Sequence, residues 1–371
     1  MFNPCSAYTI LIGTALFVGA VLSGCSHTSE LPREDVLDET ADVDYSVIYY
    51  IHADSDYLYH DASGRPVQGN RRVLDDARNV AENAGSGEVF IFYQRPEFRF
   101  LGLFPRRSSR FYHYVNGELA NKVRYRHSDS EAFLTTEARF HNRYGTRSGK
   151  ADQRKFFLFY GHEIPDGGGK NYHRTKPDIA VNAASFSEGI QQFLLRQEQQ
   201  FDLIVLSTCS NGTPLMADRL MPYASVMLAS PQNLHLSHID SGSLKLLEGE
   251  PGISNVQLAR SLAGQTFKRL ASEIRTTITL AVYDFDVVRN YHDELHAFAT
   301  AHDSPGRINS FSDNVDCRQF PMFDDDTFSK GIETWYKPAR FGRQSNATDH
   351  SGWGCKPLVE KERDRQVRHH P

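Results

Sequence analysis

The sequence predicts an α/β fold in which a mostly parallel central sheet is covered by helices on both faces. Short apolar runs rich in β-branched and aromatic residues alternate with stretches whose apolar residues recur at helical spacing. This alternation is typical of strands joined by crossover helices, which pack on the two faces of a parallel sheet. The chain of 371 residues is long enough for one large α/β domain or two small ones.

The first half of the predicted domain is a βαβ unit followed by a hairpin. In chain order we predict a strand over residues 44–51, a helix over 70–84, a strand over 88–93, strands over 110–115 and 118–126, and a helix over 128–143. Gly85 is placed to end the first helix. Asn116 and Gly117 are a type I′ turn signal between two strands. Ser128 and Glu131 have the spacing of a capping box, which predicts the start of the second helix.

The second half alternates strands and helices more regularly. We predict strands over residues 156–160, 201–209, 225–229 and 276–283, and helices over 186–200, 213–220, 254–274 and a last one ending near 301. Ser254 and Gln257 form another capping-box pattern. Residues 44–302 are therefore predicted as the folded domain, and residues 303–371 as a loop-rich C-terminal extension.

The start of the chain resembles a bacterial lipoprotein. Residues 8–21 are apolar but too short to span a membrane, and they are followed by Leu-Ser-Gly and Cys25, which matches the lipobox of a signal peptide. We predict residues 1–25 as the signal peptide and Cys25 as the lipidated residue, with an ordinary signal peptide or an uncleaved anchor as alternatives. Ser26 resembles the outer-membrane sorting pattern, so the expected location is the bacterial cell envelope, attached to the outer membrane through the lipid. Residues 26–43 are polar and acidic, typical of a flexible tether.

A cysteine and a histidine follow two of the predicted strands. Cys209 ends one apolar run, and His162 ends another run 47 residues earlier. The carboxyl ends of parallel strands carry the chemistry of open α/β folds, so the two side chains are expected to meet there. An imidazole beside a thiol lowers the thiol pKa or takes its proton, which gives a thiolate nucleophile. Taken singly, the cysteine is more simply a small buried apolar residue, but the pair favours catalysis.

Three cysteines lie beyond the signal segment, namely Cys209, Cys317 and Cys355. An odd number in an oxidising compartment predicts one bridge and one free thiol. We predict a disulfide between Cys317 and Cys355, which closes a loop worth about 4 kcal/mol in the chain-entropy model, and a free Cys209.

No metal, cofactor or nucleic-acid site is predicted. The glycine-rich residues 166–170 lack the spacing of a phosphate-binding loop. Asp166 stands where a second zinc-binding histidine after His162 would be needed. The formal net charge of −5 argues against general nucleic-acid binding.

Several segments resemble the clostripain family of cysteine peptidases, in the clan that includes caspases, gingipains and legumains. They are residues 48–54, the strand ending at His162, residues 201–212, residues 223–230 and the late strand at 279–286. The resemblance implies a caspase-like three-layer sandwich with His162 as general acid/base and Cys209 as nucleophile. It also implies that the backbone amides of Glu163 and Cys209 bind the oxyanion.

The chain departs from this family beside both catalytic positions. The family has glycine where this chain has Glu163, whose side chain crowds the substrate path. The family has Asp-Ala where this chain has Ser207 and Thr208, so a preference for basic P1 residues is not carried over unless Asp240 supplies the carboxylate. We predict the substrate pocket from Ser207, Thr208 and Asp240.

We therefore predict a lipid-anchored cysteine endopeptidase that cleaves peptides or proteins with a Cys-His dyad. The alternative is a catalytically inactive caspase-like lipoprotein that serves as a binding or assembly module, which the altered residues favour. A general α/β hydrolase is disfavoured because the chain has no Gly-x-Ser-x-Gly elbow.

Overall fold

The computed structural model describes the chain from the first strand onward. The described residues are 42–61, 63–101, 104–106, 108–127, 131–146, 153–194, 199–302, 329–342 and 350–353. The predictions for Cys25, Cys317 and Cys355 lie outside these residues. Within them, no helix is long and apolar enough to cross a membrane.

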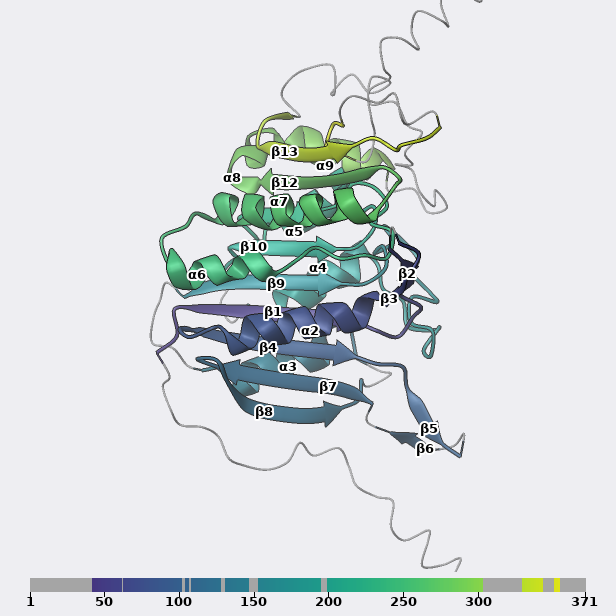
Figure 1. The fold of residues 1–371 in the computed structure, drawn as a ribbon, viewed down its shortest axis with the longest axis vertical. Coiled ribbons are helices and arrows are strands. Elements are labelled where there is room, and N and C mark those ends of the chain that lie inside the picture. Colours follow the sequence, from purple (N-terminus) through teal and green to yellow (C-terminus); the bar gives the residue numbers. More distant parts are fainter. Residues whose placement is uncertain are drawn as a thin grey trace, which may run out of the picture. The chain divides into compact units, whose positions relative to one another are not determined.

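A nine-stranded sheet runs through the molecule in the order β13-β12-β11-β10-β9-β1-β4-β7-β8 (Figure 1). The strands are β1 (Tyr45–His52), β4 (Gly87–Gln94), β7 (Ser109–Val115), β8 (Glu118–Tyr125), β9 (Arg154–Tyr160), β10 (Leu203–Ser207), β11 (Val226–Ala229), β12 (Ile278–Asp284) and β13 (Ile332–Lys337). The five central strands, from β11 to β4, are parallel, and two antiparallel strands extend each edge. The predicted mostly parallel sheet is confirmed.

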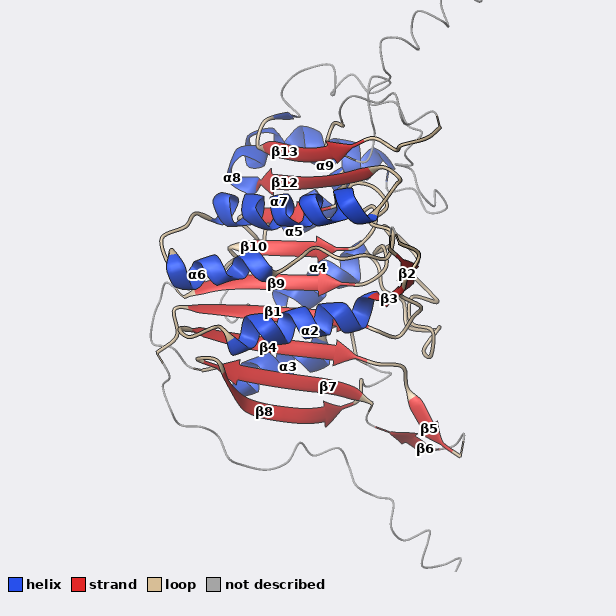
Figure 2. Cartoon of the chain, viewed as in Figure 1, coloured by secondary structure: helices blue, strands red, loops and turns tan. Residues whose placement is uncertain are grey.

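Helices cover both faces of this sheet, which gives three layers (Figure 2). One face carries α2 (Gly69–Glu82), α6 (Leu246–Gly249) and α7 (Asn255–Glu273), and the other carries α3 (Thr135–Tyr144), α4 (Ala183–Gln191), α5 (Pro214–Leu220) and α9 (His292–His302). Shorter elements are α8 (Phe285–Val288), the 3-10 helices η1 (Gly242–Lys245) and η2 (Arg289–Tyr291), and the small hairpins β2 (Leu58–His60) with β3 (Pro66–Gln68) and β5 (Phe98–Phe100) with β6 (Phe104–Arg106).

The central strands are apolar because both of their faces are covered. Every residue of β1 and β4 is buried, which is the pattern expected for strands inside a doubly covered sheet. Tyr50 and Phe159 stack across neighbouring strands with ring centroids 5.4 Å apart. The polar residues thus concentrate where the strands end, and this is where the candidate site lies.

Several local predictions are confirmed. Asn116 and Gly117 have φ angles of 50° and 84° in the turn between β7 and β8, as a type I′ turn requires. Ser254 and Gln257 form the predicted capping box at the start of α7.

The predicted helix start at Ser128 is wrong. Helix α3 begins at Thr135, because the Glu131 carboxylate is held by the first turn itself. It accepts hydrogen bonds from Thr136 Oγ1 at 2.7 Å and from Arg139 Nη2 at 2.8 Å. The helix predicted to reach residue 200 is also shorter, since α4 ends at Gln191.

Within residues 329–342 and 350–353, the part of the C-terminal extension that the structure describes, the chain includes a strand and a buried aromatic residue. Strand β13 pairs antiparallel with β12 and completes the sheet at that edge. Trp353 is fully buried, with its ring 4.9 Å from that of Tyr283 between centroids. The Tyr283 hydroxyl donates a hydrogen bond to the carbonyl of Gly352. The end of the described chain therefore belongs to the core.

We expect Trp353→Ala to lower the free energy of unfolding by about 3–5 kcal/mol, the usual cost of deleting a buried aromatic side chain. Urea denaturation followed by circular dichroism measures it. Phe341→Ala is the matched control, because Phe341 is an aromatic residue of the same segment that is 78% exposed, and its removal should change the stability by less than about 0.5 kcal/mol. Equal losses for the two variants would show that Trp353 does not pack as described.

Candidate active site

Strands β9 and β10 direct His162 and Cys209 to the same level of the sheet. The two strands are parallel neighbours, and their last paired residues are Tyr160 and Ser207. The Gly161 N–H continues the pairing to the Ser207 carbonyl at 3.4 Å. Each candidate residue lies two positions beyond the last pair. Both residues therefore lie in the turns that follow neighbouring strand ends.

The Cys209 thiol is partly exposed and contacts the loop after β11. It donates to Asn233 Oδ1 at 3.2 Å, and the Leu234 N–H donates to the sulfur at 3.2 Å. Burial raises the pKa of the thiol, although hydrogen bonds from the backbone N–H groups of Leu234, Leu236 and His235 oppose that shift. Of the two roles expected of the imidazole, lowering the thiol pKa or taking its proton, the raised pKa of the resting thiol favours the second.

The loop that supplies these amides is strained. His235 and Leu236 have φ angles of 55° and 58°, in the left-handed region that side chains other than those of glycine and asparagine rarely adopt. Consecutive backbone N–H groups in such a turn form a concave surface that favours negative charge. The loop is therefore shaped to stabilise a thiolate at Cys209. Ser210 beside the cysteine is also left-handed, with φ 52°, so strain is concentrated around the sulfur.

His162 is held by the segment that follows β1. Its Nε2 lies 2.9 Å from Ser55 Oγ, and its ring stacks on Tyr57 with centroids 4.6 Å apart. Burial lowers the pKa of this imidazole, with a smaller opposing effect of Asp56. The imidazole is thus neutral near pH 7 and able to accept a proton. In this resting arrangement it is paired with Ser55.

A row of buried imidazoles stands behind Tyr57. The Tyr57 hydroxyl bonds His52 Nδ1, and His52 Nε2 lies 3.1 Å from His173 Nδ1. Burial lowers the pKa of His52, and it lowers that of His173 to about 3. Both rings are therefore neutral, and they fix Tyr57 under His162. The sequence analysis gave these histidines no role, although His52 directly follows the first predicted strand and lies within residues 48–54.

Tyr172 fixes the peptide between His162 and Glu163. Its buried hydroxyl donates to the His162 carbonyl at 3.0 Å. Because the carbonyl and the following N–H of one trans peptide point in opposite directions, this bond turns the Glu163 N–H away from Tyr172. Within the described residues, no hydrogen bond is found for the backbone N–H of Glu163 or of Cys209. Both amides predicted as oxyanion donors are thus without an internal acceptor.

The Glu163 side chain adds a titratable group to the site. Its pKa is raised to about 7 by burial and by the charge of Asp166, against a hydrogen bond from Ser210. The carboxylate charge in turn helps to raise the pKa of the Cys209 thiol. Where the family has glycine, this chain therefore carries a group that disfavours the thiolate as the pH rises through 7.

Asn211 joins the two strand-end loops. Its Oδ1 accepts hydrogen bonds from the Ile164 N–H at 2.9 Å and from Thr208 Oγ1 at 2.6 Å, and its Nδ2 donates to the Ile164 carbonyl at 2.9 Å. The side chain is only 1% exposed. The carboxamide acts as a rung between the loop of His162 and that of Cys209. In the sequence, Asn211 was noted only within residues 201–212, which resemble the clostripain family.

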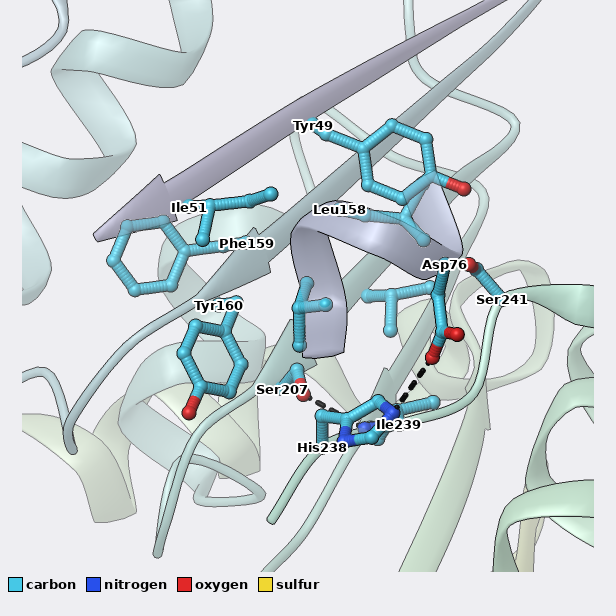
Figure 3. Close-up of a pocket in the computed structure, with 12 residues that line it drawn as sticks. Tyr49, Ile51, Asp76, Leu158, Phe159, Tyr160, Ser207, His238, Ile239 and Ser241 are labelled. Carbon is cyan, nitrogen blue, oxygen red and sulfur yellow. Dashed lines mark hydrogen bonds and ion pairs between the residues drawn. The ribbon is translucent and has the colours of Figure 1, made fainter. Parts of the chain in front are cut away.

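The three residues predicted for the substrate pocket all have partners inside the protein. Ser207 Oγ accepts the Ile239 N–H at 2.8 Å and lines a small enclosed cavity with His238, between α2 and the sheet (Figure 3). Thr208 is bonded to Asn211 and buried. Both hydroxyls therefore make hydrogen bonds inside the protein.

The Asp240 carboxylate forms an ion pair with the side chain of Arg269. Arg269 Nε lies 2.9 Å and 2.8 Å from its two carboxylate oxygens, and His238 Nε2 lies 3.5 Å from Oδ1. This carboxylate is 11% exposed and fastens α7 to the loop after β11. It is not held ready for a substrate cation.

Comparisons with known proteins rest on structure rather than sequence. No protein-family model and no curated protein matches the sequence. The fold is similar to that of iotapain, a secreted C11 cysteine protease from Bacteroides thetaiotaomicron, with a TM-score of 0.57 and 10% identity over 85% of this chain and 93% of that one.

Two further structures give the same result. A secreted C11 cysteine protease from Bacteroides thetaiotaomicron in complex with an irreversible peptide inhibitor has a TM-score of 0.53 and 11% identity, covering 88% of this chain and 97% of that one. An inactive zymogen C11 protease from Parabacteroides distasonis has a TM-score of 0.52 and 12% identity, covering 88% and 96%. This chain has the fold of the C11, clostripain-like, cysteine proteases. The resemblance stated from the sequence is confirmed at the level of the fold.

In this clostripain-like fold we expect Asn211→Ala to lower the free energy of unfolding by about 2–4 kcal/mol, since a buried polar group left without its partner costs about 1–3 kcal/mol. The change leaves the Ile164 amide, the Ile164 carbonyl and the Thr208 hydroxyl unpaired. Chemical denaturation measures the loss. Asn79→Ala on the exposed side of α2 is the control and should hardly change the free energy of unfolding. An equally small effect of Asn211→Ala would contradict the proposed role of Asn211 in joining the two loops.

Proposed function

We propose that this chain is a cysteine endopeptidase of the clostripain-like type, with Cys209 as nucleophile and His162 as general acid/base. The register of β9 and β10 is the observation that carries the proposal, because the two strands end side by side and each candidate residue follows two positions later. The likeness to C11 proteases supports it, since one of those structures holds a peptide inhibitor. The substrate is accordingly a peptide or protein.

The proposed reaction starts from a neutral pair. Burial raises the pKa of Cys209 and lowers that of His162. The thiol therefore keeps its proton, and the neutral imidazole can accept one. When a peptide binds, His162 takes the thiol proton as the sulfur attacks the carbonyl carbon. The oxygen, now negatively charged, is bound by the N–H groups of Glu163 and Cys209. His162 then gives its proton to the leaving amine, and water hydrolyses the thioester.

The resting hydrogen bonds must change for this reaction. Cys209 bonds Asn233, and His162 lies against Ser55. These neutral hydrogen bonds are worth about 0.5–1.5 kcal/mol each, and the bond from the Leu234 N–H to the sulfur and the stacking of His162 on Tyr57 add to them. Peptide binding therefore needs to supply only a modest free energy to turn the two side chains toward each other.

The specificity proposal follows from the state of the three residues predicted for the P1 pocket. Asp240 is paired with Arg269, and Ser207 and Thr208 are buried. A buried cation without a partner costs several kcal/mol, so a small or polar P1 residue is proposed rather than arginine or lysine.

The anchoring proposal rests on the sequence before the first strand. Lipidation of Cys25 would hold the domain at the bacterial outer membrane, and a Cys317–Cys355 disulfide fits an oxidising envelope. Two of the C11 structures are of secreted proteases, which is consistent with a location beyond the cytoplasm.

An inactive binding lipoprotein is the second candidate. The raised thiol pKa and the ionisable Glu163 beside the sulfur favour it, since both oppose formation of the thiolate. The two candidates differ in whether a bound peptide activates Cys209.

We expect the protein to hydrolyse members of a peptide library and Cys209→Ala or His162→Ala to reduce the rate by at least about 1000-fold, as losses of catalytic nucleophiles and bases do. His60→Ala, an exposed histidine on β2, is the control and should leave the rate unchanged. Hydrolysis that survives Cys209→Ala would exclude this nucleophile, and strong cleavage after arginine or lysine would contradict the P1 proposal.

Alkylation separates the active candidate from the inactive one. Because its pKa is raised, the resting Cys209 thiol should react with iodoacetamide more slowly than free cysteine at pH 7, and faster as the pH rises. An electrophile carried on a peptide should react much faster than iodoacetamide if peptide binding assembles the dyad, and His162→Ala should remove that advantage. An inactive protein would show no such advantage.

We expect Cys25→Ser, expressed in a Gram-negative host, to lose lipid and to stay unprocessed or leave the membrane fraction, because the acyl chains are the only proposed anchor. Acyl labelling and membrane fractionation measure it. Ser26→Asp is the matched control and should keep the lipid while favouring the inner membrane. Normal acylation of Cys25→Ser would refute the lipobox.

A further inference from the structure

Two histidines and one aspartate meet where α5 packs against α9. Asp218 lies on α5, and His292 and His296 lie one turn apart on α9. His292 Nε2 is 3.0 Å from Asp218 Oδ1, and His296 Nδ1 is 3.1 Å from both carboxylate oxygens. Each residue offers one ligand atom, and the three atoms lie within 4.8 Å of one another. None of these residues belongs to the candidate active site.

The spacing of the donor atoms fits a transition-metal ion. In a tetrahedral site with ligand bonds of about 2.0–2.1 Å, neighbouring ligand atoms are about 3.3 Å apart. The imidazole-to-carboxylate distances here are within a few tenths of an ångström of that value. The two rings lie nearly parallel, with centroids 5.9 Å apart and planes at 29°, so both present a nitrogen to the same carboxylate. Small rotations admit an ion between the three groups.

The chemistry of the donors selects the kind of metal. Two imidazole nitrogens and one carboxylate suit Zn²⁺ and its neighbours in the transition series, whereas Ca²⁺ and Mg²⁺ require oxygen ligands. The exposed fractions of His292 and His296 are 41% and 59%, and that of Asp218 is 10%. An ion can therefore enter from solvent and still be held against a largely buried carboxylate.

A second carboxylate lies near one of the ligands. Asp293 Oδ1 lies 3.8 Å from His292 Nδ1, the nitrogen that does not face Asp218. A carboxylate hydrogen-bonded to that nitrogen fixes the tautomer of a metal-binding histidine and makes the ligating nitrogen more basic. At 3.8 Å and with a fully exposed side chain, Asp293 is too far from His292 for a hydrogen bond, so it is assigned no part in the site.

A second cluster of histidine and aspartate in the described chain already has a positively charged partner from the protein itself. Asp76, His238 and Asp240 also converge, but the Arg269 guanidinium lies among them and supplies the cation. Within the described residues, the ion pairs of Asp218 are with the two imidazoles alone. The Asp218 cluster thus has ligands and no built-in cation.

We propose that Asp218, His292 and His296 form a binding site for Zn²⁺ or a similar divalent transition-metal ion, with water completing the coordination. The ion would clamp α5 to α9. Helix α5 begins at Pro214 behind the Thr213 cap, directly after the turn that carries Cys209, so the clamp stiffens the support of that turn. The site is inferred from its own residues and stands whether or not the chain is a peptidase.

Calorimetric titration of the protein, purified without a histidine tag and in a Cys209→Ala background, tests the site with Zn²⁺. One ion should bind per chain, with a melting temperature higher by about 2–5 °C at saturation. Co²⁺ should give the visible absorption of a low-symmetry nitrogen and oxygen site. His296→Ala, a change at an exposed position, should weaken binding more than 10-fold.

The controls separate this site from other histidines. His60→Ala and the pair His369→Ala with His370→Ala near the C-terminus should leave the affinity unchanged. Zn²⁺ binding that is insensitive to His296→Ala and Asp218→Asn would overturn the proposal. So would the absence of binding, or equal binding of Ca²⁺.

Discussion

The candidate site depends on the in-register pairing of two parallel strands, β9 and β10. Parallel strands deliver their carboxyl ends to one edge, but the chains diverge once the backbone ladder stops. Asn211 continues the ladder beyond that point, because its carboxamide offers an acceptor and a donor in the geometry of a peptide group and bonds both backbone groups of Ile164. A side chain thus takes over from main chain where the sheet ends. The Asn211 hydrogen bonds to Ile164 therefore set the position of the His162 loop relative to the Cys209 loop.

Burial imposes a second constraint, because it opposes charge on every group of the site. The shifts of the Cys209 and His162 pKa values both favour neutral forms. A thiolate and an imidazolium can exist together there only if fixed dipoles replace the lost water. The N–H groups of residues 234–236 and the oriented Glu163 amide are such dipoles. The strained turns that present these N–H groups cost about 1–3 kcal/mol each. This cost is explained if the N–H groups stabilise the thiolate during the reaction.

The sequence was informative where physical signals are local. Apolar runs located the central strands, and the Asn116-Gly117 turn and the Ser254 cap were readable because their geometry is set by neighbouring residues. The start of α3 was misjudged because Glu131 has partners inside the helix as well as a position suited to capping. The role of Asp240 was not readable at all, since its partner Arg269 comes from a later helix. The Asn211 clamp and the Asp218 cluster likewise join residues that only the fold brings together. Spacing shows that His292 and His296 share a helix face, but not what that face meets.

The last strand of the sheet has a consequence for how the chain is made. Strand β13 and Trp353 come from the final part of the sequence, yet they cover one edge of β12 and part of its core. During synthesis, β12 emerges about 50 residues before its partner, which at about 5–20 residues per second is a delay of several seconds. For that time an unpaired β-edge is open to strands of other nascent chains. A holdase chaperone that keeps the chain unfolded until translation is complete would remove this hazard.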